Sequence, residues 1–347
     1  WRCAPSLRGT PARAGQSQGP KGASASTGGG RQRGAQRGHH RAEAAAVRAW
    51  GGPARSCVAA LALAGLLASV GTSTRAGELH TERSLYRNIL VYEDDGLRCM
   101  KFGRRAAGRQ TCMALSDRDR LVFDYTRMMM AALYLNPAPQ RVLIIGLGGG
   151  TLPSALQKIL PAAQIDAVEI DPAVVRVARK YFEFVPGRQT EVFEEDGRVF
   201  VKRMQKQRTR YDLVLLDAFD HEYIPEHLLT REFLLEVRGL LSARGVLAAN
   251  TFAGSRLYNF ESATYFSVFG DFYRLKRGNR VILVRLGGLP DSDELGRNAV
   301  IVEDKLAPFG VGKEWLLPLF EVESDWPGDT RVLTDQYSPS NLLNGSF

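Results

Sequence analysis

Residues 141–172 read RVLIIGLGGGTLPSALQKILPAAQIDAVEIDP, and this stretch decides the fold. The apolar run 142–145 has the composition of a strand that is buried on both faces. The glycines follow it at once: Gly146, Gly148, Gly149 and Gly150. Apolar residues then recur at helical spacing over 152–159, where Thr151 is expected to cap the helix. A second apolar run, 165–170, completes a strand–loop–helix–strand unit.

The glycine loop and the acids after the second strand predict a nucleoside-type ligand. Glycines permit a sharp turn and let a ligand lie against the backbone. Glu169 follows Gly146 by 23 residues, and Asp171 comes just after it. The expected separation between such a loop and the acid that binds the ribose hydroxyls is roughly 20 residues. We therefore expect the loop glycines, Glu169 and Asp171 to form a cofactor site. A strand–helix–strand unit with a tight turn and no ligand is the alternative.

Two later strands add further acids. The run 190–193 predicts a strand, and Asp196 and Gly197 after it can accept a hydrogen bond from an adenine amino group or form a solvated turn. The run 211–216 predicts a fourth strand, which leads to Asp217 and Asp220. Ligands bind at the carboxyl ends of parallel strands in open α/β sheets, so we place the reaction zone here. The alternative is that these two acids only cap the next helix.

The rest of the chain predicts an α/β fold in which a small β-hairpin domain precedes a doubly wound sheet. A hairpin is expected over 88–102, a third strand over 110–115 and a helix over 120–135. The predicted segments are a basic low-complexity segment at 1–56, an apolar segment at 57–78, a small β domain at 79–119, the doubly wound domain at 120–290 and a tail at 291–347.

The positive charge of the chain is confined to its N-terminal segment. The formal net charge is +9, and residues 1–56 hold ten Lys or Arg and one acid, Glu43. The remaining residues are therefore neutral overall. Binding to nucleic-acid phosphates relies on surplus positive charge, so we expect no nucleic-acid partner for the folded part.

The N-terminal segment and the cysteines bear on location. Residues 1–56 have few large apolar side chains and are therefore expected to be disordered. They are alternatively expected to be untranslated, because the first methionine is Met100. The apolar run 57–71 resembles a secretory signal or a short anchor, so any membrane contact is expected only there. This predicts export or membrane anchoring, or a cytoplasmic protein if the start is misplaced. Cys99 and Cys112 are expected to be thiols, or to pair if the protein is exported. No metal-ligand spacing is present.

Residues from about 84 to 285 resemble the spermidine synthase (polyamine aminopropyltransferase) family. That family has the Rossmann-like class I fold of S-adenosylmethionine-dependent transferases. The D-x-x-D that follows the fourth strand is the most specific match. The matching words are LYRNILVYEDDG, DYTRM, NPAPQRVLIIGLGGG, DAVEIDP, EDG, YDLVLLDAFD, LLTREFL and GVLAANTF.

The resemblance implies roles for individual residues. Glu169 would bind ribose, Asp196 would bind adenine, and the glycine loop would hold the sulfonium tail. Asp217 would assist the attacking amine, and Asp220 would seat it. The other residues expected at the substrate are Tyr86, Tyr125 and Tyr223. The implied co-substrate is decarboxylated or intact S-adenosylmethionine, the acceptor is a small-molecule amine, and no metal is required. A homodimer is left open.

Three positions depart from the family pattern. Gly149 stands where the family loop carries an aspartate that contacts the donor's amino group. Arg87 and Arg127 stand near the expected amine pocket, where cations would repel a diamine. These departures keep two alternatives open. One is a methyltransferase that uses intact S-adenosylmethionine, and the other is a catalytically idle nucleoside-binding relative.

Overall fold

The computed structural model describes residues 77–103, 108–218, 224–322 and 324–344. All of these belong to the second of the two units into which the chain divides, residues 69–347. The predicted segment 1–56 and the apolar run 57–71 lie outside the described residues. Among the described residues, no helix is long and apolar enough to span a membrane.

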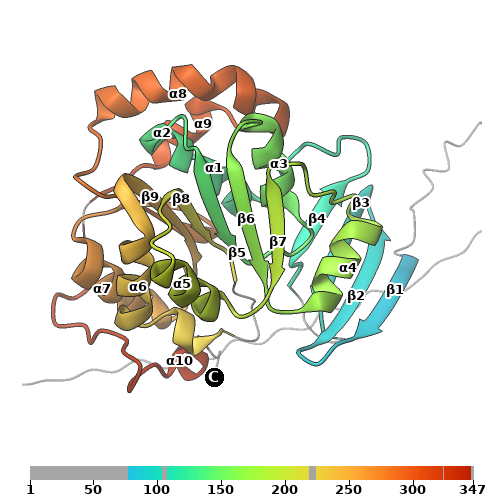
Figure 1. The fold of residues 1–347 in the computed structure, drawn as a ribbon, viewed down its shortest axis with the longest axis horizontal. Helices are drawn as coiled ribbons and strands as arrows, with labels where there is room; N and C mark the ends of the chain where they lie inside the picture. Colours follow the sequence, from blue (N-terminus) through green and yellow to red (C-terminus); the bar gives the residue numbers. More distant parts are fainter. Residues whose placement is uncertain (1–76, 104–107, 219–223, 323, 345–347) are drawn as a thin grey trace, which may run out of the picture. The chain divides into compact units, whose positions relative to one another are not determined.

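A seven-stranded sheet forms the centre of this unit, in the order β10-β11-β9-β8-β5-β6-β7 (Figure 1). The neighbouring strands from β9 to β7 are parallel, whereas β11 and β10 are antiparallel. This is the predicted doubly wound sheet with an antiparallel edge. The strands are β5 (Arg141–Ile145), β6 (Gln164–Glu169), β7 (Thr190–Glu194), β8 (Tyr211–Leu216), β9 (Leu241–Thr251), β10 (Tyr273–Arg277) and β11 (Asn279–Arg285).

Alternation along the buried strands supplies both faces of the sheet with apolar side chains. In β5, Val142 and Ile144 face one helical layer, and Leu143 and Ile145 face the other. The first layer contains α1 (Asp124–Met130), α2 (Ala132–Leu135), α3 (Thr151–Ile159), α4 (Pro172–Tyr181) and α8 (Ser292–Leu306). The second layer contains α5 (Gly197–Lys206), α6 (Arg231–Leu240) and α7 (Leu257–Phe269) (Figure 1).

The small N-terminal domain is an antiparallel sheet in the order β1-β2-β3-β4. Its apolar face packs against α4, where Ile89 and Met100 contact Val174 and Val177. Its strands are β1 (Gly77–Arg83), β2 (Asn88–Asp94), β3 (Leu97–Phe102) and β4 (Thr111–Ala114). The hairpin and third strand match the prediction, and β1 was not predicted.

The expectation that Cys99 and Cys112 are thiols is wrong, because they form a disulfide. They are directly opposite residues of β3 and β4, and their Cα atoms lie 4.1 Å apart. The antiparallel register therefore brings two side chains together that are 13 residues apart in the sequence.

Several elements differ from the sequence prediction. The predicted helix over 120–135 is split into α1 and α2. Thr151 is the first residue of α3 rather than its cap, since Gly150 occupies the cap position in a left-handed conformation. The predicted tail contributes α8, which buries Leu295, Ala299, Val302 and Leu306 against the first layer. Short helices follow at α9 (Lys313–Leu316) and α10 (Ser340–Asn344).

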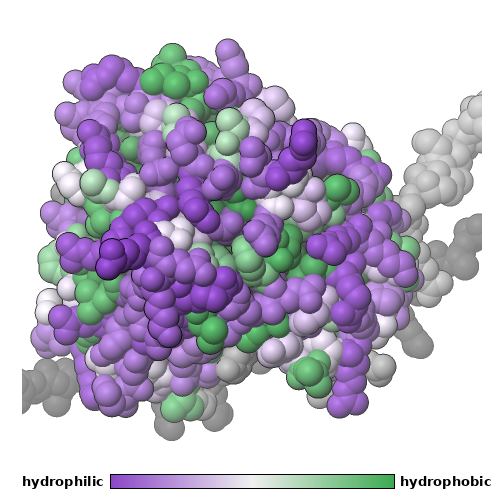
Figure 2. Space-filling model, in the orientation of Figure 1, coloured by the Kyte–Doolittle hydropathy of each residue, from purple (hydrophilic) through white to green (hydrophobic). Residues whose placement is uncertain are grey.

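The surface in the view of Figure 2 is mostly hydrophilic, with small apolar areas. One of these lies over α8, whose outward residues Val300 and Ile301 are exposed. Single exposed apolar residues are ordinary on soluble domains and need no ligand to explain them.

Candidate active site

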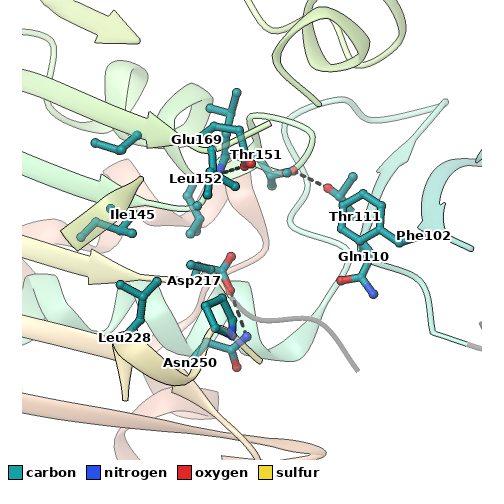
Figure 3. A pocket seen from close by; sticks show the side chains of 18 of the residues that line it. Phe102, Gln110, Thr111, Ile145, Thr151, Leu152, Glu169, Asp217, Leu228 and Asn250 are labelled. Carbon is teal, nitrogen blue, oxygen red and sulfur yellow. Dashed lines mark hydrogen bonds between the residues drawn. The ribbon is translucent and has the colours of Figure 1, made fainter. Parts of the chain in front are cut away.

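A cavity of about 230 Å³ lies at the carboxyl ends of β5, β6 and β8. The strand order of the sheet reverses between β5 and β8, which is where open α/β sheets bind ligands. The walls come from both domains, because Phe102, Gln110 and Thr111 of the N-terminal sheet region face Glu169 and Asp217 across it (Figure 3).

The glycine loop lies directly against the start of the reaction zone. Gly146 has a positive φ of 102°, and a Cβ there would lie 2.2 Å from the carbonyl oxygen of Asp217. Only glycine fits this approach. Gly146 and Gly148 line the cavity, whereas Gly149 and Gly150 do not. Gly150 instead turns the chain into α3, where a Cβ would lie 2.5 Å from the Phe184 ring.

Thr111 occupies the space beside Gly149. A Cβ on Gly149 would lie 2.8 Å from Thr111 Cγ2 and 2.9 Å from Thr111 Oγ1. The Thr111 hydroxyl also lies 3.1 Å from Thr151 Oγ1, and the two side chains share a hydrogen bond (Figure 3). The space in which a loop aspartate would begin is therefore filled by a threonine.

Glu169 lies at the end of β6 and lines the cavity. Its carboxylate accepts hydrogen bonds from the backbone N–H groups of Leu147 at 3.1 Å and Asp171 at 3.0 Å. Burial raises the pKa of Glu169 above its ordinary value, against those hydrogen bonds and the charge of Arg87. The acid thus ties the glycine loop to β6 and presents acceptor oxygens to a ligand.

The structure does not place Asp171 at the cavity. Its carboxylate is buried, accepts a hydrogen bond from Ala173 N at 2.9 Å and caps α4. The Ser84 hydroxyl also donates to it at 2.5 Å. Asp171 therefore joins α4 to the segment between β1 and β2, and its side chain is occupied by structural contacts.

Asp196 and Gly197 line the cavity at the start of α5. Asp196 Oδ1 accepts hydrogen bonds from the first turn of the helix, and Oδ2 lies 2.8 Å from His227 Nε2. The hydrogen bond with His227 holds the pKa of Asp196 below its ordinary value. Asp196 is therefore an ionised acceptor at neutral pH. His227, which also lines the cavity, was not predicted from the sequence.

Asp217 follows β8 at the floor of the cavity. Its Oδ1 accepts a hydrogen bond from Asn250 Nδ2 at 2.9 Å (Figure 3). Its Oδ2 accepts one from the Tyr125 hydroxyl at 3.3 Å. Burial raises the pKa of Asp217 to about 7, although both hydrogen bonds lower it and the charge of Glu169 adds to the rise. Asp217 can therefore exchange a proton near neutral pH.

Two of the remaining predicted substrate residues are present at the cavity. Tyr86 and Tyr125 both line it, and Tyr86 is half exposed. Burial and the charge of Asp217 raise the pKa of Tyr125 well above its ordinary value, so its hydroxyl stays a donor. Asp220 and Tyr223 lie outside the described residues.

The two arginines noted in the sequence have different surroundings. Arg87 lines the cavity, and its guanidinium lies 4.2 Å from the centre of the Phe102 ring. Arg127 is not among the lining residues; it pairs with Asp124 and lies 5.0 Å from the Trp315 ring centre. Arg127 is therefore not positioned to repel an amine in the cavity.

Sequence reasoning missed the polar side chains that support Asp217. Asn250 and Asn279 both line the cavity, and Asn279 Nδ2 donates to Asn250 Oδ1 at 3.0 Å. Asn250 is the penultimate residue of the buried strand β9, at the same edge as Asp217, so the rule that located the aspartate would also have located the asparagine. Within the described ranges, no group of three or more His, Cys, Asp or Glu could hold a metal ion.

Comparisons with known proteins agree with this geometry. A family model for the spermine/spermidine synthase domain matches residues 122–272. A polyamine aminopropyltransferase of Vibrio vulnificus is 48% identical over 281 residues, which are 79% of this chain and 93% of that protein. A polyamine aminopropyltransferase of Neisseria meningitidis serogroup A is 31% identical over 182 residues, 52% of this chain and 67% of that protein.

A solved structure has the same fold. The crystal structure of a spermidine synthase in complex with the transition-state analogue AdoDATO aligns with a TM-score of 0.56 and 20% identity, over 71% of this chain and 86% of that one. The order of strands, the position of the cavity and the extent of the Vibrio match lead to one conclusion: this chain belongs to the polyamine aminopropyltransferase family, the spermine/spermidine synthases.

Proposed function

We propose that this chain transfers an aminopropyl group from decarboxylated S-adenosylmethionine to a small-molecule amine. The observation that carries the proposal is Asp217, a buried carboxyl with a pKa of about 7 at the floor of a cavity. Glu169 and Asp196, the acceptors expected for a ribose and an adenine, line the same cavity.

The reaction is an in-line displacement at a carbon next to a sulfonium. The amine nitrogen forms a bond to that carbon, and the carbon–sulfur bond breaks with its electron pair going to sulfur. The products are the aminopropylated amine and methylthioadenosine. The protein forms no covalent bond to either reactant in this reaction, so alignment of the two reactants provides much of the rate enhancement.

The proton on the amine sets the requirement for a base. An aliphatic amine is protonated at neutral pH, with a pKa of about 10, and must lose a proton to attack. Asp217 takes that proton in the proposed reaction. Its pKa of about 7 makes it a stronger base than an exposed aspartate, while most of it is still ionised just above neutrality.

The test is turnover by the full chain with defined donors and amines. We expect methylthioadenosine and an aminopropylated product, detected by mass spectrometry, when decarboxylated S-adenosylmethionine is supplied with a diamine such as putrescine. The matched control is Asp217→Asn, which keeps the shape of the side chain and removes the base. Absence of both products with every diamine and triamine tried would reject the proposal.

Methyl transfer from intact S-adenosylmethionine is the second candidate, and one observation favours it. Position 149, where the family loop carries an aspartate, is a glycine packed against Thr111, so no carboxylate at this position attracts a donor ammonium or repels a donor carboxylate. The two donors are distinguished by calorimetric titration and by the product. A methylated amine and S-adenosylhomocysteine would support methyl transfer.

We also propose that the chain works in an oxidising compartment. The support is the Cys99–Cys112 disulfide, because such bonds persist mainly outside the reducing cytosol. The signal-like run 57–71 points the same way. Alkylation of free thiols in intact cells, followed by mass spectrometry, tests this. Protection of both cysteines is expected, and alkylation of both would contradict export.

A further inference from the structure

The sheet register brings three side chains from three strands to the same face at the cavity. In the parallel β8–β9 pair, Leu216 lies opposite Ala249, so Asp217 and Asn250 come next to each other where the two strands end. In the antiparallel β9–β11 pair, Asn250 lies opposite Val281. Asn279 is two residues from Val281 and therefore occupies the diagonal position on the same face. Polar side chains can reach one another across such a diagonal.

When Asp217 is ionised, the hydrogen bonds between these side chains can be arranged in only one direction. An ionised carboxylate only accepts hydrogen bonds, so Asn250 must turn Nδ2 toward Asp217, as it does at 2.9 Å. The Asn250 Oδ1 atom then faces away and needs a donor. Asn279 Nδ2 supplies it at 3.0 Å.

We propose that Asn279 is a positioning residue for the transfer reaction, because its amide fixes Asn250 with Nδ2 toward Asp217. This inference rests on the proposed function, since it assigns the residue to the base of that reaction. If Asn279 is removed, the Asn250 side chain is free to rotate. In the reversed orientation its carbonyl oxygen faces the carboxylate, an arrangement that is favourable only when Asp217 is protonated.

The neighbouring residue on β11 makes Asn279 a rigid support. Arg280 is fully buried, and its guanidinium donates to Thr251 Oγ1 at 2.7 Å and Glu261 Oε2 at 3.0 Å. It also lies 3.8 Å from the centre of the Tyr258 ring. These contacts join β11 to β9 and α7 immediately beside Asn279. A functional side chain is held accurately when the residues around it are themselves fixed.

Other groups also act on Asp217, so the test must separate them from Asn279. Among the described residues they are Tyr125 of α1, which donates to Oδ2, and Glu169 of β6, whose charge disfavours ionisation of Asp217. Asn250 and Asn279 carry no charge. Their contribution is a single directed hydrogen bond, and neither Tyr125 nor Glu169 changes when they are substituted.

The experiment is a double-mutant cycle on the full chain, with Asn279→Ala, Asn250→Ala and the double variant. Each is followed in two ways: the acid limb of kcat against pH, and the ¹³C chemical-shift titration of the Asp217 carboxyl in the enzyme without substrate. We expect Asn279→Ala to raise the apparent pKa in both readouts by roughly half to one pH unit. In the Asn250→Ala background, Asn279→Ala should then have no further effect.

The matched control is Asn298→Ala. Asn298 also donates through Nδ2, to the carbonyl of Tyr134 at 2.8 Å, but it lies on α8 outside the cavity lining. The Asn298→Ala substitution removes a comparable hydrogen bond without changing any contact of Asp217, and should leave the titration of the Asp217 carboxyl unchanged. If Asn279→Ala fails to fold, Asn279→Leu serves instead, because it is close in size, removes the donor and adds no charge. It should raise the pKa of Asp217 as Asn279→Ala does.

Three outcomes would overturn the inference. They are a pKa shift in Asn279→Ala no larger than in Asn298→Ala, additive effects of the two cavity asparagines, or a fall in kcat without any movement of the titration. Loss of the proposed function itself is distinguishable from these. The carboxyl titration does not depend on turnover and would still report the arrangement of Asn279, Asn250 and Asp217.

Discussion

The two halves of the cavity are built in different ways. The donor half, from Gly146 to Gly197, comes from one continuous stretch of sequence and uses turns, helix starts and backbone hydrogen bonds. The reaction half brings together Tyr125, Asp217, Asn250 and Asn279 from four different elements. Its properties arise from contacts between side chains that are distant in the sequence.

This difference implies that donor binding and proton transfer can be altered separately. A change in the donor half should weaken binding of the nucleoside and leave the chemical step intact at saturation. A change in the reaction half should do the reverse. Steady-state kinetics separates the two, because loss of uniform binding raises KM and loss of a transition-state contact lowers kcat.

The largest expected effect is that of Asp217→Asn. The amide keeps the size of the side chain but cannot accept the amine proton, so kcat should fall by about 10²- to 10⁴-fold. Donor affinity, measured by calorimetry with decarboxylated S-adenosylmethionine, should stay close to that of the unaltered chain. A comparable loss of donor affinity would mean that the two halves are not separable.

The same substitution should change how stability depends on pH. The pKa of Asp217 rises from 3.8 in an unfolded chain to about 7 in the folded one. The folded state therefore binds a proton that the unfolded state lacks between these values. The stability that this proton contributes is fully present below about pH 4 and is lost as the pH rises through 7.

Asp217→Asn removes this pH-dependent contribution. From pH 5 to pH 8 the free energy of unfolding of the variant should rise, relative to that of the unaltered chain, by on the order of 2–3 kcal/mol. Urea unfolding at the two pH values measures the difference. Glu261, whose burial raises its pKa to about 7, titrates in both proteins and cancels. If the two proteins differ in their free energy of unfolding by the same amount at pH 5 and at pH 8, the pKa of Asp217 is not raised by folding.

Glu169→Gln tests the donor half. Hydrogen bonds to a charged acceptor contribute about 1.5–3 kcal/mol, so the donor Kd should rise by roughly 10- to 100-fold. At saturating donor, kcat should be nearly unchanged. Because the Glu169 charge raises the pKa of Asp217, the acid limb of kcat should move slightly to lower pH. A large fall in kcat at saturation would contradict the separation of the halves.

Tyr125→Phe has the smallest expected effect. It removes the hydroxyl that donates to Asp217 Oδ2 at 3.3 Å and leaves the ring in place. One hydrogen bond of about 1 kcal/mol corresponds to a change of roughly fivefold in kcat near neutral pH. Since this hydrogen bond lowers the pKa of Asp217, the acid limb should move to higher pH. Movement in the opposite direction would mean that the hydroxyl does not stabilise the ionised carboxylate.

Much of the donor half could be predicted from the sequence, because its information is local. Strand, glycine turn, helix and acid follow one another along the chain, and the structure places Gly146, Glu169 and Asp196 at one cavity. Asp171 stands in the same short stretch, but its side chain caps α4 and does not line the cavity. An acid at a strand end serves either purpose, and only the fold determines which.

The reaction half could be predicted only in part. Asp217 was predicted from its place at a strand end, and the same rule would have located Asn250, but the contact of Asn279 with Asn250 arises from the order β11-β9-β8, which local patterns do not contain. The Cys99–Cys112 disulfide could be predicted only as an alternative to two thiols for a similar reason, since it depends on the exact register of β3 and β4. Pairing between strands is set by tertiary packing, and one residue of slip would separate these partners.

The contact between Gly146 and Asp217 has a consequence for directed evolution of this enzyme. The glycine loop touches the strand end through backbone atoms alone, and the Asp217 N–H donates to the Ile145 carbonyl at 2.8 Å. A library that adds bulk at position 146 would therefore displace Asp217, the proposed base, along with the glycine loop. Variants that accept an altered donor tail are better sought at Gln110 and Thr111, which line the cavity, since the Thr111 hydroxyl is hydrogen-bonded to Thr151 and not to Asp217.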